Sequence, residues 1–401
     1  MTTVTRSADT KPATARNGRS ERFSARRILW DLSTVSRVRV CGHHGVLPDG
    51  NVAVKLSGTG ADKKAGFSGV ATCGSTWACP VCSQKIATTR ALDIAAAVAA
   101  WHEKNGRVLF LTLTMRHRKG QRLADLWDTL SYAWGKVTSG RGWVRDSELY
   151  GTIIPKKSAV PELVEVGGRL HETRGTTEST KIGFARVVET THGKNGWHIH
   201  VHALLFVRGD VAEDDAYALA DSMFGRWVPA LTSKGLTAPT LAHGVDVRLV
   251  GKDDAVLLGD YFSKNVYGGK SDAIKAGFEV AGGSAKKAGN GNRTPFQILA
   301  DVVKTGDADD LAIWWEWEAA SHGRRQLTWS VGLRDFLALG AEMTDEEAAE
   351  EDQGGEVVLT LTAAEFSAIR YSAETLLDLL EDHSTCGPAR AWLASHRVDQ
   401  C

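Results

Sequence analysis

The stretch Trp197-His-Ile-His-Val-His-Ala-Leu-Leu-Phe206 decides the fold. In a β-strand successive side chains point to opposite faces, so His198, His200 and His202 share one face of this strand. Three unpaired imidazoles would be costly to bury on an otherwise apolar strand. A row of nitrogen ligands for a metal ion is therefore favoured over a row of solvent-facing or core histidines.

A second strand precedes this one and forms a hairpin with it. The run Phe184–Thr191 is followed by Asn195-Gly196, a strong signal for a two-residue hairpin turn. That turn would place Glu189 opposite His202, on the face of the histidines. Imidazole accepts Zn or Mn and a carboxylate favours Mn or Mg, so the pattern predicts a divalent-ion site.

The flanking segments predict an α+β fold with a central antiparallel sheet flanked by helices. Val108–Met115 is apolar on both faces, which is typical of a strand inside a sheet. Helical patterns occupy Ile86–His102 and Arg122–Lys136. Residues 155–180 contain two prolines and paired glycines and are expected to form an insertion or a long loop.

Composition narrows the class of protein. The 401 residues are 43% hydrophobic and 24% charged, as in soluble globular proteins. No apolar run approaches the ~18 residues of a membrane-spanning helix, and no signal peptide is present, so we expect a cytoplasmic protein with no membrane partner.

The net charge of zero hides an asymmetry. Residues 1–150 contain 23 Lys and Arg against 11 Asp and Glu, whereas residues 341–401 contain 3 against 14. A basic half favours a polyanionic partner, and an acidic tail favours solvation or self-shielding.

The chain is expected to contain five segments. These segments are a disordered basic arm (1–29), a cysteine-rich zinc-binding module with a helix (30–100), the sheet domain (101–340), an acidic linker (341–356) and a small helical tail (357–401). Alternatively, the basic arm could contact DNA non-specifically.

Four cysteines predict a structural zinc site in the N-terminal module. Cys41, Cys73, Cys79 and Cys82 supply the four thiolates of a closed tetrahedral site, and the last two form a Cys-x-x-Cys knuckle. His43 could replace Cys41, as could its neighbour His44. Independent buried thiols are the alternative.

A tyrosine and a lysine form a candidate catalytic pair. Tyr261 and Lys264 lie one helical turn apart in a predicted helix, where the ammonium group would stabilise a phenolate nucleophile. Ordinary helix surface is the alternative. Tyr267 also lies three residues from Lys264, but it borders Gly268-Gly269, where the helix should end. Candidate phosphate contacts are Lys194, Lys270, Lys286, Lys287 and Arg293.

These motifs together resemble the HUH endonucleases. The resemblance rests on a first strand motif, a histidine-hydrophobic-histidine motif and a Tyr-Lys motif, in that order. A closer resemblance is to the replication initiators of rolling-circle plasmids from actinobacteria, and it covers roughly residues 35–335. The segments that carry it are Val108–His117, Cys73–Cys82, Glu189–His198, His198–Phe206, Tyr261 with Lys264, and Thr328–Leu333.

The resemblance implies an HUH-like fold and a DNA-nicking activity. His200 and His202 match the paired metal ligands, with His198 and Glu189 competing for the third place. Tyr261 matches the nucleophile and Lys264 the lysine that follows it. The implied cofactors are Mg or Mn at the histidines and structural Zn.

The implied reaction cuts one strand of plasmid origin DNA, duplex or single-stranded, through a 5′-phosphotyrosine. Its free 3′-hydroxyl would serve a host DNA polymerase, with a host helicase as a further partner. Members carry Glu or Tyr where this chain has Leu257, and Asp254, Asp260 or Tyr267 are the substitutes. Alternative functions are a conjugative relaxase, a single-strand transposase or a non-catalytic zinc-dependent DNA-binding protein.

Overall fold

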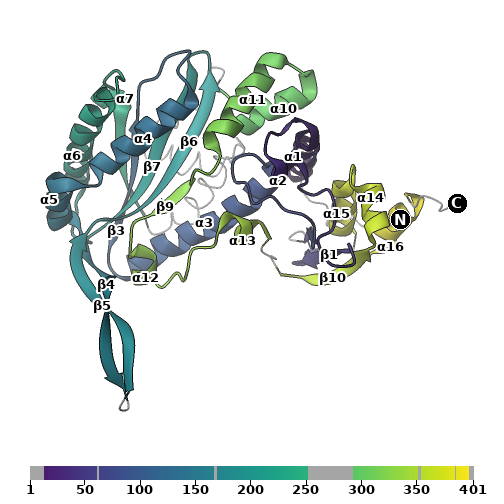
Figure 1. Cartoon of the computed structure of the whole chain (residues 1–401), viewed down its shortest axis with the longest axis horizontal. Coiled ribbons are helices and arrows are strands. Elements are labelled where there is room, and N and C mark those ends of the chain that lie inside the picture. Colours follow the sequence, from purple (N-terminus) through teal and green to yellow (C-terminus); the bar gives the residue numbers. More distant parts are fainter. Residues whose placement is uncertain are drawn as a thin grey trace, which may run out of the picture. The chain divides into compact units, whose positions relative to one another are not determined.

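The computed structural model describes residues 13–60, 63–166, 169–251, 292–350, 354–383 and 385–396. The chain divides into two compact units. We call the first the cysteine unit and the second the sheet unit; both combine helices with antiparallel sheets (Figure 1). The cysteine unit contains Met1–Ile86, Leu299–Ala319 and Met343–Cys401, and the sheet unit contains Ala87–Ile298 and Ala320–Glu342.

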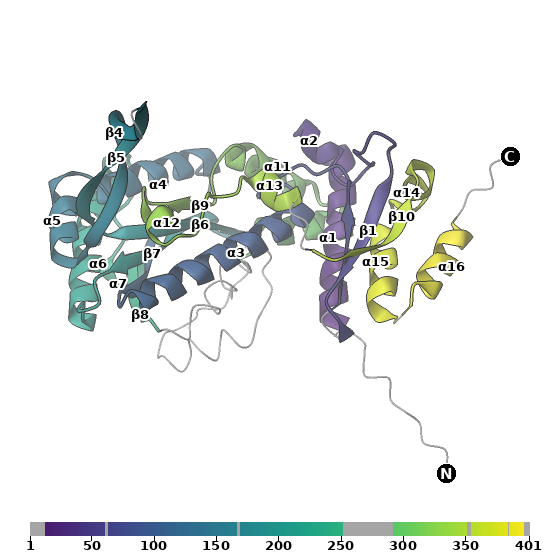
Figure 2. The same cartoon turned by 90° about the horizontal axis from the view of Figure 1, so that it is seen from below.

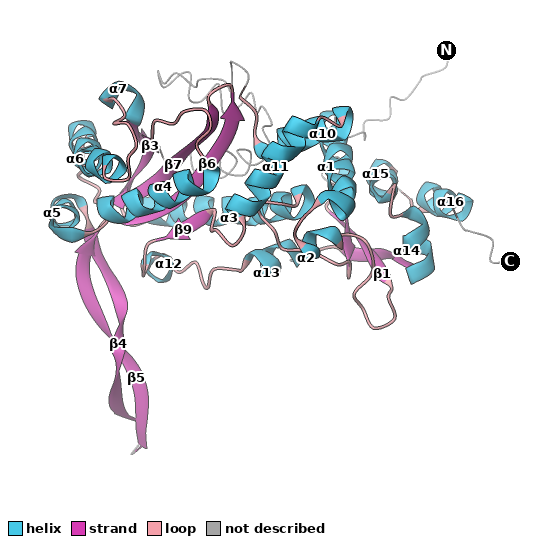
Figure 3. Cartoon of the chain, turned by 45° about the horizontal axis from the view of Figure 1, so that its top comes forward, coloured by secondary structure: helices cyan, strands magenta, loops and turns pink. Residues whose placement is uncertain are grey.

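A five-stranded antiparallel sheet forms the centre of the sheet unit (Figure 3). The expected strand at Val108–Met115 forms within β3, and the histidine strand is β7, the middle strand of the five. In order across the sheet, the strands are β8 (Val245–Val250), β3 (Arg107–Thr114), β7 (Gly196–Val207), β6 (Gly183–Gly193) and β9 (Leu327–Trp329).

Helices cover both faces of this sheet. Figure 2 shows α3 (Pro80–Glu103) on one face and α4 (Leu123–Val137) on the other, and α4 packs beside α6 (Glu213–Thr232). Trp101 of α3 packs edge-on against Phe206 of β7 in a buried core. Because residues alternate along β7, the face that carries Phe206 also carries the three histidines closer to the hairpin turn.

Of the two alternatives expected for residues 155–180, the long loop is wrong, because the described residues of this range form strands. They belong to β4 (Thr152–Val166) and β5 (Arg169–Lys181), which pair antiparallel as a two-stranded ribbon. Each strand has an unpaired edge, where a proline without an N–H group is tolerated, and a register irregularity lies between Lys157 and Pro161. The two prolines therefore did not exclude a strand.

The cysteine unit joins the two ends of the chain in one sheet. Its order is β10 (Glu356–Leu361), β1 (Val52–Ser57) and β2 (Lys64–Ser68), and Val52 pairs with Leu361. The expected separate helical tail is thus partly a strand of the N-terminal sheet, because the apolar run at residues 357–361 completes a common core. The neighbouring helices are α13 (Asp345–Glu350), α14 (Ala363–Ile369), α15 (Ala373–Asp382) and α16 (Gly387–Ser395).

The basic N-terminal segment is helical from residue 13, not disordered as its composition predicted. Helix α1 (Ala13–Leu32) buries Leu29 completely, and two of its arginines pair with acidic residues of α15. Arg27 Nη1 lies 2.8 Å from Glu374 Oε2, and Arg19 Nη2 lies 2.6 Å from Glu381 Oε1. Part of the charge asymmetry is therefore internal, because carboxylates of the C-terminal segment pair with two arginines of the basic N-terminal segment.

The described residues contain six further helices. They are α2 (Ser36–Arg39), α5 (Gly140–Tyr150), α7 (Leu241–Gly244), α10 (Pro295–Thr305), α11 (Ala308–Ser321) and α12 (Leu333–Phe336). Among the described residues, none of the helices has the length and apolarity required to cross a membrane.

Candidate metal centres

The register of the β6–β7 hairpin differs from the expected one by two residues. Gly193 pairs with Gly196, so the turn is Lys194-Asn195, and Glu189 lies opposite His200 rather than His202. The reason is the backbone of the turn: Gly196 has φ +83°, whereas neither residue of the turn has a positive φ. An Asn195-Gly196 turn of type I′ would need positive φ at both of these residues, and only Gly196 has it. Because the shift is an even number, Glu189 stays on the face of the histidines.

Glu189, His200 and His202 meet at one point of this face. The carboxylate Oε2 of Glu189 lies 2.9 Å from His200 Nε2 and 2.8 Å from His202 Nε2, and the two nitrogens are 2.9 Å apart. Two donors that each lie ~2.1 Å from a shared ion at right angles would be about 3 Å apart. The three residues, here called the triad, therefore fit a bound metal ion.

The electrostatics of the triad favour the charge states that bind metal. Burial alone would raise the pKa of Glu189, but the charges and hydrogen bonds of His200 and His202 outweigh it and hold that pKa well below its ordinary value. Burial, together with repulsion from His200, lowers the pKa of His202. At neutral pH the triad thus combines a carboxylate with a neutral imidazole at His202.

His202 is oriented by groups from the neighbouring strand β3. Its Nδ1 lies 3.0 Å from the hydroxyl oxygen of Thr112, and its ring stacks on Phe110 at 5.2 Å between ring centroids. A hydrogen bond at one ring nitrogen fixes the tautomer and aims the other nitrogen at the metal. His202 Nε2 is accordingly directed to the triad.

His198 lies beside the triad and has a different partner. Its Nδ1 is 3.3 Å from Nδ1 of His117, in the loop after β3. Burial is the main cause that lowers the pKa of His198 to about 3, with repulsion from His200 and His117 adding to it. Of the two residues that compete for the third ligand position, the geometry thus brings Glu189 and not His198 to the other two.

The four cysteines also meet, in the cysteine unit. Cys41 Sγ lies 3.6 Å from Cys79 Sγ and 3.5 Å from Cys82 Sγ, and Cys73 Sγ lies 3.6 Å from Cys82 Sγ. Thiolates that are ~2.3 Å from a tetrahedral zinc ion are about 3.8 Å apart. All four are buried, and Cys41 rather than a neighbouring histidine completes the set. The cluster could hold a metal ion.

The electrostatics of this cluster are compatible with a bound cation. Hydrogen bonds from the other three thiols lower the pKa of Cys82, whereas burial raises the pKa of Cys79. Four buried thiolates would repel one another without a metal ion between them. Arg26 is a buried residue whose guanidinium lies against the backbone of Gly42, the residue that follows Cys41.

Comparison with known proteins shows the family of this chain. It is 31% identical over 327 residues to the protein named "Protein rep" from Streptomyces lividans, which covers 72% of this chain and 70% of that protein. The chain belongs to the Rep protein family. A "Neomycin resistance protein" from Streptomyces cyanogenus is 29% identical over 177 residues, 40% of this chain and about a third (36%) of that protein. No family model matches the chain, and no solved structure matches it.

Several predicted site residues of this Rep family member lie outside the described residues. They are Tyr261, Lys264, Lys270, Lys286 and Lys287, together with the alternatives Asp254, Leu257, Asp260 and Tyr267.

The other two predicted phosphate contacts are near the hairpin. Lys194 is exposed in its turn, and Arg293 forms a β-bridge with His192 through N–O distances of 2.9 and 2.8 Å. The chain therefore re-enters the described structure beside the turn of the histidine hairpin.

Sequence reasoning missed two contributors to the triad's surroundings. One is Thr112, whose hydroxyl contacts His202, and the other is His117, whose imidazole contacts His198. A signal existed for the second: His117 lies within Arg116-His-Arg-Lys119, a basic run at the end of a central strand. No local pattern distinguishes Thr112 from other strand threonines.

Proposed function

We propose that this Rep family member initiates plasmid replication by nicking and rejoining one DNA strand at the origin. The observation that carries the proposal is the triad, in which a carboxylate and two imidazoles lie within 2.9 Å of one another at the middle of an antiparallel sheet. The similarity to a Rep protein and the resemblance to the HUH endonucleases support the same conclusion.

Glu189, His200 and His202 would hold Mg²⁺ or Mn²⁺. When bound, such an ion polarises the scissile phosphodiester and stabilises the charge that develops on it. Other residues of the chain orient the metal ligands. Thr112 and Phe110 orient the ligand imidazole of His202, and the hairpin register holds Glu189 against both histidines.

Tyr261 is the proposed nucleophile. Its phenol oxygen loses a proton and forms a bond to phosphorus, while the bond from phosphorus to the 3′ oxygen breaks and that oxygen takes up a proton. The products are a 5′-phosphotyrosine, which conserves the bond for rejoining, and a 3′-hydroxyl that a host DNA polymerase extends. Lys264 stabilises the phenolate. In sequence, the segment that carries both connects β8 to Arg293, the residue that pairs with His192.

The cysteine cluster is proposed to hold one structural zinc ion. A closed set of four thiolates leaves no position for a substrate, so this ion would stabilise the fold rather than take part in the reaction. The cysteine unit would then be rigid around its metal, with Cys79 and Cys82 fixed at the beginning of α3.

A covalent-adduct assay tests the proposal. Purified protein is incubated with labelled single-stranded oligonucleotides that tile the DNA flanking its gene, with Mg²⁺ or Mn²⁺ or with chelator. We expect one oligonucleotide to give a metal-dependent protein–DNA band that survives denaturation. DNA binding without any adduct across the whole tile set would instead favour the non-catalytic DNA-binding function.

A further inference from the structure

A basic loop follows the central strand β3. Residues 116–122, here called the basic loop, contain four cations and no acidic side chain. The four cations are all exposed, and none of them forms an ion pair with a residue that the structure describes. They are Arg116, Arg118, Lys119 and Arg122. Such a surface carries positive charge that no acidic side chain among the described residues neutralises.

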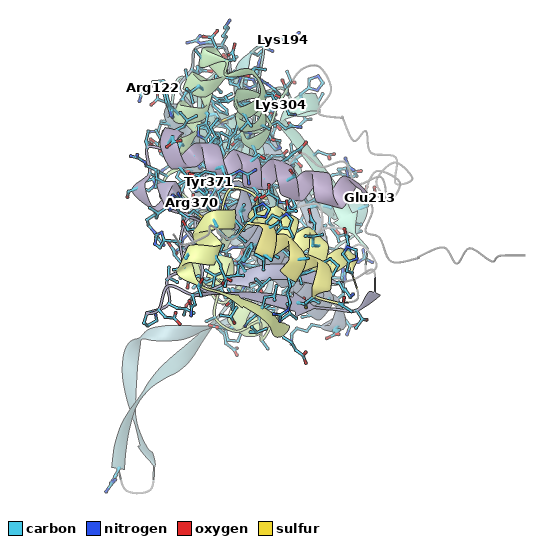
Figure 4. All side chains as sticks on the ribbon, turned by 90° about the vertical axis from the view of Figure 1, so that its right-hand side faces the viewer. Arg122, Lys194, Glu213, Lys304, Arg370 and Tyr371 are labelled. Carbon is cyan, nitrogen blue, oxygen red and sulfur yellow. The ribbon has the colours of Figure 1, made fainter. Side chains whose placement is uncertain are left out.

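The basic loop is held against the turn of the histidine hairpin. A Cβ atom at Gly196 would lie 3.4 Å from Lys119 Cα and 3.5 Å from the carbonyl oxygen of Arg118, so the two backbones are in contact. The amide of Arg118 donates a 2.7 Å hydrogen bond to Gln121 Oε1, which closes the loop on itself. Lys194 adds a fifth exposed cation from the hairpin side; Figure 4 shows it and Arg122 pointing outward at the same upper edge of the picture.

A row of imidazoles leads from this loop to the triad. The ring centroids of His117 and His198 are 4.9 Å apart, those of His198 and His200 are 5.0 Å apart, and those of His200 and His202 are 4.5 Å apart. Of these four rings, only those of His200 and His202 belong to the triad. His117 and His198, here called the histidine pair, thus lie between the metal ligands and the exposed cations.

We propose that the basic loop and the histidine pair bind the sugar–phosphate backbone of an unpaired DNA strand next to its scissile phosphate. The inference rests on the proposed function, because it assumes that the strand reaches the triad. Arg and Lys side chains position a strand through phosphate contacts that carry no sequence information. Each imidazole of the histidine pair has a ring N–H group that can donate a hydrogen bond to a phosphate oxygen.

Charge reversal tests the loop. The double variant Arg118→Glu/Lys119→Glu should bind single-stranded DNA at least about tenfold more weakly at moderate salt. If each residue contacts one phosphate, the slope of log affinity against log salt should become shallower by about 1.4. The matched control is Lys104→Glu, an exposed lysine before the opposite end of β3, which should change neither quantity. Manganese binding, measured by calorimetry, should be the same in all three proteins.

Alanine variants test the histidine pair. His117→Ala and His198→Ala should raise KM for the oligonucleotide and weaken DNA binding several-fold while manganese affinity stays unchanged, whereas His200→Ala should lose manganese affinity. If His198→Ala loses manganese binding as His200→Ala does, His198 is a metal ligand and the assignment is wrong.

The role proposed for the basic loop is wrong if the double variant Arg118→Glu/Lys119→Glu keeps the wild-type DNA affinity and salt slope. If the wild-type protein binds no single-stranded DNA, the proposed function fails and the inference falls with it. If it nicks DNA and the variants above are unaffected, the inference alone is overturned.

Discussion

Glu189 and His200 face each other directly across the antiparallel pair β6–β7, with the carboxylate Oε2 2.9 Å from the imidazole Nε2. The same oxygen lies 2.8 Å from His202 Nε2. One carboxylate therefore completes a three-donor set whose other two members come from a single strand.

Loss of one donor should remove most of the metal affinity. We expect His200→Ala to bind Mn²⁺ at least about 100-fold more weakly, and Glu189→Gln to do so by about 10- to 100-fold, since the amide keeps an oxygen but loses the charge. Isothermal calorimetry measures both. Glu213→Gln, on the exposed surface of α6 (Figure 4), is the control and should bind as the wild type does. Wild-type affinity in His200→Ala would contradict the triad.

The orientation of His202 should depend on Thr112. Thr112→Val keeps the volume of the side chain but removes the hydroxyl that contacts His202 Nδ1, so Mn²⁺ affinity should fall by about 10- to 100-fold. Thr190→Val is the control because Thr190, a buried strand threonine, pairs with Ile199 on the other face of the hairpin. Equal affinities in the two variants would exclude a role for the Thr112 hydroxyl.

Tyr261→Phe should bind metal and DNA as the wild type does and form no covalent adduct, while Tyr267→Phe should retain adduct formation. An attacking oxygen must be held in line at ~3–3.5 Å from phosphorus, and a residue inside a helix is held better than one at its frayed end. Peptide mapping of the trapped adduct locates the nucleotide. Its recovery on Tyr267, or on another residue, would show that the assignment is incorrect.

The cysteine cluster should contain about one zinc ion per chain. Cys79→Ser should lose this ion and lower the unfolding midpoint by about 5 °C or more, because the metal joins the segment around Cys41 to residues 73–82. Metal analysis and thermal unfolding measure the two effects. Cys386→Ser is the control, since Cys386 is only half-buried and lies outside the cluster. Retention of zinc by Cys79→Ser would argue against the site.

Acidification should destabilise the protein through His198. Its folded pKa of about 3 lies below the ordinary 6.5, so the unfolded chain binds more protons and stability falls as pH decreases from about 6.5 toward 3. One such group lowers the free energy of unfolding by up to about 1.4 kcal/mol per pH unit in that range. Urea unfolding of the wild type and of His198→Ala, compared between pH 7 and pH 4.5, should show the smaller loss in the variant. Parallel curves would refute this cause.

Much of the candidate site could be predicted from local sequence. The two-residue period of a strand places His198, His200 and His202 on one face whatever the register. Glu189 stays on that face for the same reason, although its partner was predicted incorrectly. That error came from the turn: Asn195-Gly196 is compatible with more than one hairpin loop, and the backbone of Gly196 decides between them.

The sequence by itself determined the features that depend on neighbours along the chain: the alternation of the histidines, the apolar central strand and the Cys-x-x-Cys knuckle. Only the tertiary structure decided which distant groups meet. Val52 pairs with Leu361, Arg27 with Glu374, and Cys41 joins Cys79, because burial of a shared core brings these segments together. Such contacts follow from the packing of the whole chain, and no local periodicity records them.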